Sequence, residues 1–285
     1  MARQTDQGYG NYVPPKEEKR HPLTRSDTEK LYQAAVQYPD VETELAVRVL
    51  LDYGLRVGEL VHMREHWITQ EYKRTAGKEV WRIKIPKVEY CWGGVGPTGG
   101  GNGSGANLHK TDQPCYNCRH RSWQKKVAPK NDDGDPQPDR GWITEQQAEE
   151  YDFAPKTERS ATKVWQLGDL EESAETAQKL KQFLKAQPHE QWPHLEGNVN
   201  RHIDRVAEEA DLTLPDRSRN EIVAHALRHT YGCRLVEASI AEGTAMKQMR
   251  HQDPDVFRWY ADVRGTRVVS ALFDAVSDND SLLHE

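Results

Sequence analysis

The residues best suited to chemistry lie in the last third of this 285-residue chain. His225 and Arg228 stand three positions apart in the run His-Ala-Leu-Arg-His-Thr, and His251 precedes Tyr260 by nine residues. Arg56 lies early in the chain, in the run Gly-Leu-Arg-Val-Gly-Glu-Leu. Arginine grips phosphate through two parallel hydrogen bonds and stays charged, histidine moves protons near neutral pH, and an activated tyrosine can attack phosphorus. Together these residues can hold and cleave a phosphodiester without a metal ion.

Each of these residues also has an ordinary explanation when it is considered alone. Arg56 could cap a helix or pair with Glu59, Tyr260 could be an amphipathic surface residue, and His225 could be structural. Two arginines, however, would neutralise the non-bridging oxygens of a phosphate as charge builds up in the transition state. A phenol with a pKa of about 10 needs such electrostatic help before it attacks. The combination, in this order and at these spacings, favours catalysis.

Hydrophobic periodicity predicts the elements that must position these residues. Thr24 or Ser26 caps a first helix that begins near Asp27, and Pro39 ends it. Alternation of apolar and polar residues predicts strands over 79–86 and 162–167. Residues 1–20 are polar and are expected to form a flexible arm. Further helices are expected at 41–53, 56–64, 144–151, 170–186, 198–210, 222–238, 244–249, 253–263 and 268–276.

An insertion interrupts the predicted pair of strands. Residues 93–105 contain eight of the 20 glycines in the chain, which predicts a loop. Since no Gly-Lys-Ser or Gly-Lys-Thr follows, this loop is not a phosphate-binding P-loop. The segment 89–150 is therefore interpreted as an insertion within a β-hairpin, inside one domain over 21–285.

The cysteines of this insertion have the spacing of a metal site. Cys115 and Cys118 form a Cys-x-x-Cys pair, Cys91 follows the predicted strand, and His109 and His120 flank the pair. Three thiolates and one imidazole would close a tetrahedral structural zinc site. The predicted ligands are Cys91, His109, Cys115 and Cys118, with His120 as the alternative to His109. Free cysteines in a loop are the competing interpretation.

The overall composition sets broad limits. Lys and Arg number 39 against 45 Asp and Glu, giving a net charge of −6. This balance argues against nonspecific coating of DNA, although a local basic cleft remains compatible with it. A mild acidic bias would also suit a salt-rich cytoplasm such as that of haloarchaea. No run of 18 apolar residues and no apolar N-terminal signal core occur, so a soluble, cytoplasmic protein is expected.

Over about residues 22–275, these motifs resemble the catalytic domain of the tyrosine recombinases, or phage-type integrases. The resemblance implies that Arg56 and Arg228 hold the scissile phosphate, while His225 and His251 assist proton transfer or bind the phosphate. It implies that Tyr260 forms a 3′-phosphotyrosyl bond and releases a 5′-hydroxyl. Glu59 would then be structural.

The family also uses a lysine on a β-hairpin as the general acid for the leaving 5′-oxygen. Lys156 is the first choice, because it precedes the strand predicted over 162–167. Lys87 is the alternative, because it ends the preceding strand. An ordinary solvated lysine is the competing explanation for either residue.

By this resemblance the fold is α+β and mainly helical, with a small antiparallel sheet and the Cys-containing insertion. The expected partners are double-stranded DNA and further copies of the chain, as a homotetramer on recombination sites. No cofactor is expected for catalysis. Two features depart from the family: Arg250 stands where a glycine is usual, and only about 20 residues precede the first helix, where a DNA-clamping domain is usual. Arg250 could alter the local turn or add a phosphate contact.

Two other functions fit part of the same pattern. A type IB topoisomerase shares the chemistry but relaxes supercoils, and the chain size and the His-Ala-Leu-Arg-His-Thr run favour the recombinase over it. A DNA-binding accessory module without catalysis is the second alternative, and the retained arginine, histidine and tyrosine set argues against it.

Overall fold

The computed structural model describes residues 22–94, 114, 115, 118, 131–135, 153–156, 158–167, 171–212, 222–251 and 253–264. The predicted arm over 1–20, the helices expected at 144–151 and 268–276, and both His109 and His120 lie outside these residues. No helix in the described ranges is long and apolar enough to cross a membrane.

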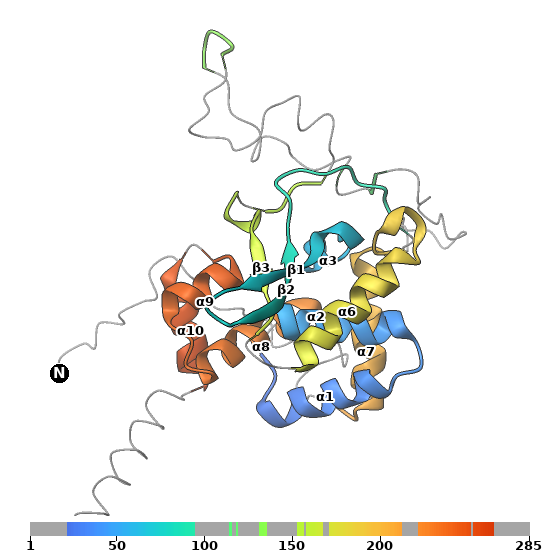
Figure 1. Ribbon diagram of the computed structural model, residues 1–285. Helices are drawn as coiled ribbons and strands as arrows, with labels where there is room; N and C mark the ends of the chain where they lie inside the picture. Colours follow the sequence, from blue (N-terminus) through green and yellow to red (C-terminus); the bar gives the residue numbers. More distant parts are fainter. Residues whose placement is uncertain are drawn as a thin grey trace, which may run out of the picture.

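The described residues form a mainly helical protein with one small antiparallel sheet, which confirms the predicted fold class (Figure 1). The helices are α1 (Arg25–Gln37), α2 (Val41–Tyr53), α3 (Val57–Leu60), α6 (Glu171–Lys185), α7 (Glu196–Glu209), α8 (Ala224–Glu237), α9 (Glu242–Met249) and α10 (Pro254–Arg264). The strands are β1 (Ile68–Lys73), β2 (Lys78–Lys84) and β3 (Lys163–Trp165), and short 3-10 turns lie at Glu65–Trp67, Glu158–Ser160 and Pro188–Glu190.

Helix α2 is the centre of the fold. Every residue from Glu42 to Tyr53 is buried, because α2 contacts α1, α6, α7 and α8. Asp40 caps its first turn by accepting a hydrogen bond from the backbone of Thr43 at 3.0 Å. Gly54 ends it in the left-handed conformation, with φ of 56°. The helix therefore fixes the position of the segment that follows it, which carries Arg56.

The sheet has the order β1-β2-β3, with both pairings antiparallel. Strands β2 and β3 flank the Cys-containing insertion, as expected for an insertion within a hairpin. Strand β1 was not predicted from the sequence. It is an edge strand in which Ile68 alone is fully buried, so its pattern is too polar to be recognised by alternation.

The third predicted helix, over 56–64, was too long. Helix α3 is a single turn, and the chain then forms the 3-10 turn Glu65–Trp67 before it enters β1. The short α3 leaves His62 in a turn outside any regular helix. This position becomes important for the cysteine cluster described below.

A second apolar cluster holds the C-terminal helices together. Helix α10 contacts both α8 and α9, and Figure 1 shows α9 and α10 on the side of the sheet away from α6 and α7. The ring of Tyr260 on α10 lies directly over Gly232 of α8, where a β-carbon would stand 2.5 Å from the ring. Because Gly232 has no β-carbon, the ring of Tyr260 can pack closely against α8, the helix that carries His225 and Arg228.

We predict that Gly54→Ala destabilises the protein strongly. Its φ of 56° is unfavourable for alanine, at about 1–2 kcal/mol, and a β-carbon would lie 2.1 Å from the Tyr231 ring. This overlap adds roughly 1–3 kcal/mol. Gly77→Ala is the matched control, because Gly77 has φ of 65° with no atom within 4 Å of the added carbon. Urea unfolding should show the larger loss for Gly54→Ala, and equal losses would contradict this packing.

Candidate active site

Two arginines from distant motifs converge on one backbone oxygen. Arg228 on α8 and Arg250 after α9 both donate to the carbonyl oxygen of Gly54, the latter at 2.9 Å. The second terminal nitrogen of Arg228 donates to the carbonyl oxygen of Met249. Both side chains are buried. The left-handed turn at Gly54 therefore exposes the oxygen that brings the two guanidinium groups together.

Arg56 joins this group at its more open side. It precedes α3 directly, and its terminal nitrogens donate to the hydroxyl of Ser160 at 2.7 Å and to the carbonyl oxygen of Arg250 at 3.3 Å. Its side chain remains 23% exposed, in contrast to the other two arginines. Arg56, Arg228 and Arg250, together with Glu59, are called the guanidinium cluster below.

Glu59 is the carboxylate at the centre of the guanidinium cluster. It accepts from the guanidinium of Arg250 at 2.7 Å and of Arg56 at 3.0 Å, and from the backbone N–H of Arg56 at 2.7 Å. Burial alone would raise the pKa of Glu59, but Arg250, Arg56 and Arg228 outweigh burial and lower this pKa to about 2. Glu59 is therefore ionised under ordinary conditions.

The charges of the guanidinium cluster do not balance. Three guanidinium groups meet a single carboxylate, and burial together with mutual repulsion lowers the pKa of Arg228 and of Arg250. Buried cations shift in this direction when their surroundings hold too few anions. The physical consequence is that an anion bound beside the site would stabilise it.

Arg250 occupies the position where the sequence departed from the family pattern. Its backbone has φ of 57° and ψ of 36°, so the turn has the left-handed conformation that glycine would favour. Its side chain is fully buried and paired with Glu59. The backbone at Arg250 therefore has the conformation that a glycine would also adopt there. Sequence reasoning missed this role, because nothing in the local pattern links positions 250 and 59.

The candidate nucleophile lies beside a histidine that was not selected as a site residue. The hydroxyl of Tyr260 is 2.9 Å from Nδ1 of His229 on α8. The His229 ring also meets Trp259 edge to face, with ring centroids 5.1 Å apart. The signal was available, because His229 is part of the His-Ala-Leu-Arg-His-Thr run. Position on the helix, rather than residue type, decides which histidine meets the tyrosine.

The two predicted histidines lie on either side of this pair. His251 stacks against the Tyr260 ring, with centroids 5.9 Å apart. Burial, followed by repulsion from Arg228 and Arg56, lowers the pKa of His251 far below its ordinary value, so it is neutral here. His225 is exposed and meets the His229 ring edge to face at 4.3 Å.

The two lysine candidates lie on neighbouring segments. Lys156 and Lys87 are both exposed. Glu89 pairs with Phe153 in an antiparallel bridge, so the two lysine-bearing segments run side by side. Lys156 lies four residues before Ser160, which contacts the guanidinium cluster.

Three of the predicted metal ligands also come together. Cys91, Cys115 and Cys118 form a group with His62, and their four ligand atoms lie within 4.8 Å of one another. The predicted fourth ligand, His109, and its alternative, His120, fall outside the described residues. A second group, Glu42, His194 and His202, meets the same distance criterion, but it supplies only two imidazoles and a carboxylate.

Comparisons with known proteins are limited to structural similarity. Neither a family model nor a curated protein matches the sequence. The chain is similar to the XerH site-specific recombinase in a post-cleavage complex with difH DNA, at 13% identity and a TM-score of 0.48, over 90% of this chain and 53% of the other. It is similar to the Tn1549 transposon integrase bound to transposon right-end DNA, at 14% identity and a TM-score of 0.48, over 91% of this chain and 67% of the other. It is also similar to lambda integrase in a dimer bound to a core site, at 17% identity and a TM-score of 0.42, over 90% of this chain and 64% of the other. The chain thus spans about half the length of the XerH chain.

We predict that Glu59→Gln lowers the free energy of unfolding by roughly 3–5 kcal/mol at pH 7, because it leaves buried guanidinium groups without their carboxylate. The folded-state pKa is depressed, so this stabilisation is present above about pH 4.5 and is lost as the pH falls toward 2. Urea unfolding of the parent and the variant should therefore converge in acid.

The matched control is Glu71→Gln. Neighbouring lysines lower the pKa of Glu71 to about 2 as well, but this carboxylate lies on the sheet surface. Solvent screening makes such pairs weak, so the control should lose much less stability. Similar losses for both variants would contradict the account of the guanidinium cluster.

Proposed function

We propose that the protein breaks and rejoins DNA strands through a covalent tyrosine intermediate, as a site-specific recombinase or integrase. The observation that carries this proposal is the guanidinium cluster, with its excess positive charge, whose Arg228 interacts electrostatically with Tyr260, a tyrosine already hydrogen-bonded to His229. The proposal also rests on the motif resemblance described for the sequence.

In the proposed reaction, the Tyr260 oxygen attacks a backbone phosphorus and forms a 3′-phosphotyrosyl bond. The bond from phosphorus to the 5′-oxygen breaks, and this oxygen leaves as a hydroxyl after it receives a proton. His229 Nδ1, at 2.9 Å, is placed to accept the proton of the phenol. Because one phosphate ester replaces another, the bond energy is kept and the reverse reaction rejoins the strand.

The arginines would stabilise the charge that builds up on phosphorus. Arg56 is partly exposed and can meet a phosphate oxygen directly. Each terminal nitrogen of Arg228 carries a second hydrogen beyond the one it donates to a carbonyl. In a water-poor site, such fixed donors stabilise a transition state more than they would in water. Glu59 and Arg250 then act as the support that holds the two phosphate-binding arginines.

Tyr260 must become accessible before it can react. It is 0% exposed, packed over Gly232 of α8. Helix α10 packs on α8 and α9. We therefore propose that α10 shifts away from α8 before Tyr260 attacks DNA. The alternative function, a DNA-binding module without catalysis, would need no such movement.

Recombination between two duplexes requires four strand cleavages. Since each chain offers one Tyr260, four copies would assemble on the paired sites, and this homotetramer is part of the proposal. A type IB topoisomerase would need only one copy, because it cuts one strand and reseals it. The number of chains on a cleaved substrate therefore distinguishes the two activities.

We predict that a nicked suicide duplex, drawn from the flanks of the native gene, forms a slowly migrating covalent adduct with the parent protein. Tyr260→Phe should abolish the adduct while DNA binding is retained, because the nucleophilic oxygen is lost. Tyr72→Phe, at an exposed tyrosine of β1, should form the adduct normally. A denaturing gel reports the result. Binding without any adduct from the parent would instead support the accessory-module alternative.

We further predict that Lys156→Ala slows cleavage by roughly 10²–10⁴-fold, as expected for loss of a general acid. Lys87→Ala is the matched variant on the neighbouring segment and should cleave normally. A substrate with sulfur in place of the leaving 5′-oxygen needs no acid, because a thiolate leaves readily. Single-turnover rates on this substrate should be restored for Lys156→Ala. A defect confined to Lys87→Ala would transfer the role to Lys87.

A further inference from the structure

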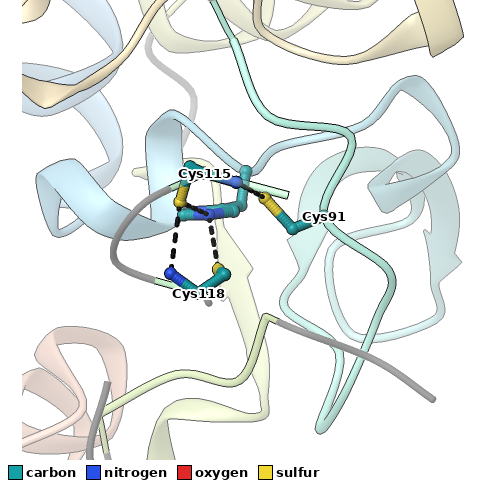
Figure 2. Close-up of side chains that lie close together, drawn as sticks. Cys91, Cys115 and Cys118 are labelled. Atoms are coloured by element: carbon teal, nitrogen blue, oxygen red, sulfur yellow. Dashed lines mark hydrogen bonds between the residues drawn. The ribbon is translucent and has the colours of Figure 1, made fainter. Parts of the chain in front are cut away.

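The cysteine-bearing insertion meets the body of the protein at a compact group of four side chains. Cys91, Cys115, Cys118 and His62 are all buried, and Figure 2 shows the three cysteines gathered at this point. None of the four cysteines in the chain forms a disulfide. His62 is held outside the helices, in the turn between α3 and β1. This group is called the Cys–His cluster.

The distances within the Cys–His cluster match those of a tetrahedral metal site. Nε2 of His62 lies 3.2 Å from the sulfur of Cys118 and 3.5 Å from the sulfur of Cys115. Zinc–sulfur bonds of about 2.3 Å and zinc–nitrogen bonds of about 2.0 Å place such atoms about 3.5 Å apart in a tetrahedron. The two nitrogen–sulfur distances therefore fit one zinc ion, and all four ligand atoms lie within 4.8 Å of one another.

The hydrogen bonds around the Cys–His cluster orient its atoms for metal binding. Nδ1 of His62 donates to the carbonyl oxygen of Gly58 at 2.6 Å. Since a carbonyl can only accept, the proton of the neutral ring lies on Nδ1 and the lone pair of Nε2 faces the sulfurs. Such a bond from the far ring nitrogen to a carbonyl is the usual support of a metal-binding histidine.

The sulfur atoms receive matching support from the backbone. The N–H groups of Gly93 and Cys115 donate to the sulfur of Cys91 at 3.3 and 3.4 Å, and the N–H of Cys118 donates to the sulfur of Cys115 at 3.4 Å. Figure 2 shows bonds between the cysteine residues as dashed lines. Donors aimed at sulfur favour the thiolate, which is the form that binds a metal.

We infer that His62, Cys91, Cys115 and Cys118 hold a structural zinc ion that fastens the insertion to the turn carrying Arg56. Three thiolates and one imidazole, all buried, leave no open position for a substrate, as expected of a structural rather than a catalytic zinc. His62 replaces His109 and His120, the ligands expected from the sequence. The inference does not depend on the proposed reaction.

The connection to the guanidinium cluster runs through α3. Gly58, which accepts from His62, lies between Arg56 and Glu59 in the same turn of chain. Phe153, just after the end of the insertion, stacks on the His62 ring with centroids 4.5 Å apart. Zinc at this position therefore joins the start of the insertion, its Cys-x-x-Cys pair and its end to the segment that positions Arg56.

The test begins with the metal content of the full chain, purified without a polyhistidine tag and without added metal. Mass spectrometry of the digested protein should find one zinc per chain. X-ray absorption should find three sulfurs at about 2.3 Å and one nitrogen at about 2.0 Å. Both measurements use the parent protein, so they decide the proposal even if the ligand variants fail to fold. Absence of zinc, or a site of sulfurs alone, would overturn it.

Single variants then identify the ligands. His62→Asn and Cys118→Ser should each reduce zinc by at least tenfold, whereas Cys233→Ser should retain one zinc, because Cys233 lies on α8 outside the Cys–His cluster. His109→Asn and His120→Asn should also retain it. Retention of zinc in His62→Asn, with loss in His109→Asn or His120→Asn, would overturn the assignment of His62.

Discussion

The arrangement of the candidate site depends on one constraint, which is how two buried guanidinium groups and a third, partly exposed one can share a single carboxylate. Glu59 offsets part of the repulsion and the carbonyl oxygen of Gly54 accepts from two of the arginines. This requires the left-handed turn at Gly54, directly after the most buried helix of the protein. Glu59 compensates only part of the positive charge of the three arginines. The interaction that brings the arginines together therefore also favours binding of a further anion at the site.

The supporting elements can be understood as ways of holding this cluster. Helix α2 fixes Gly54, α3 fixes Glu59 through its single turn, and α8 and α9 bring Arg228 and Arg250 from the far end of the chain. The Cys–His cluster adds a further support, because His62 bonds to Gly58 within α3. The chain that follows the insertion also reaches this region, since Phe153 stacks on His62 and Ser160 accepts from Arg56.

Much of this fold could be predicted from the sequence, because its helices follow strong local signals. Helix α2 was predicted with its observed bounds from its apolar periodicity and from Gly54, and the structure adds Asp40 as its N-terminal cap. Strand β1 escaped notice because an edge strand buries too few residues to alternate clearly. His62, His229 and the pairing of Arg250 with Glu59 also escaped. Their importance depends on contacts between distant segments, which cannot be inferred from the spacing of residues along the chain.

The central claim is that Tyr260 attacks a phosphate held by the guanidinium cluster. The most direct test is to trap the protein on a nicked duplex, digest with nuclease and trypsin, and locate the nucleotide by mass spectrometry. Trypsin cuts after Arg258 and Arg264, so it releases a six-residue peptide, Trp259 to Arg264, whose only tyrosine is Tyr260. The account predicts the nucleotide on this peptide. A nucleotide on any other residue, or unmodified peptides from protein bound to the duplex, would contradict it.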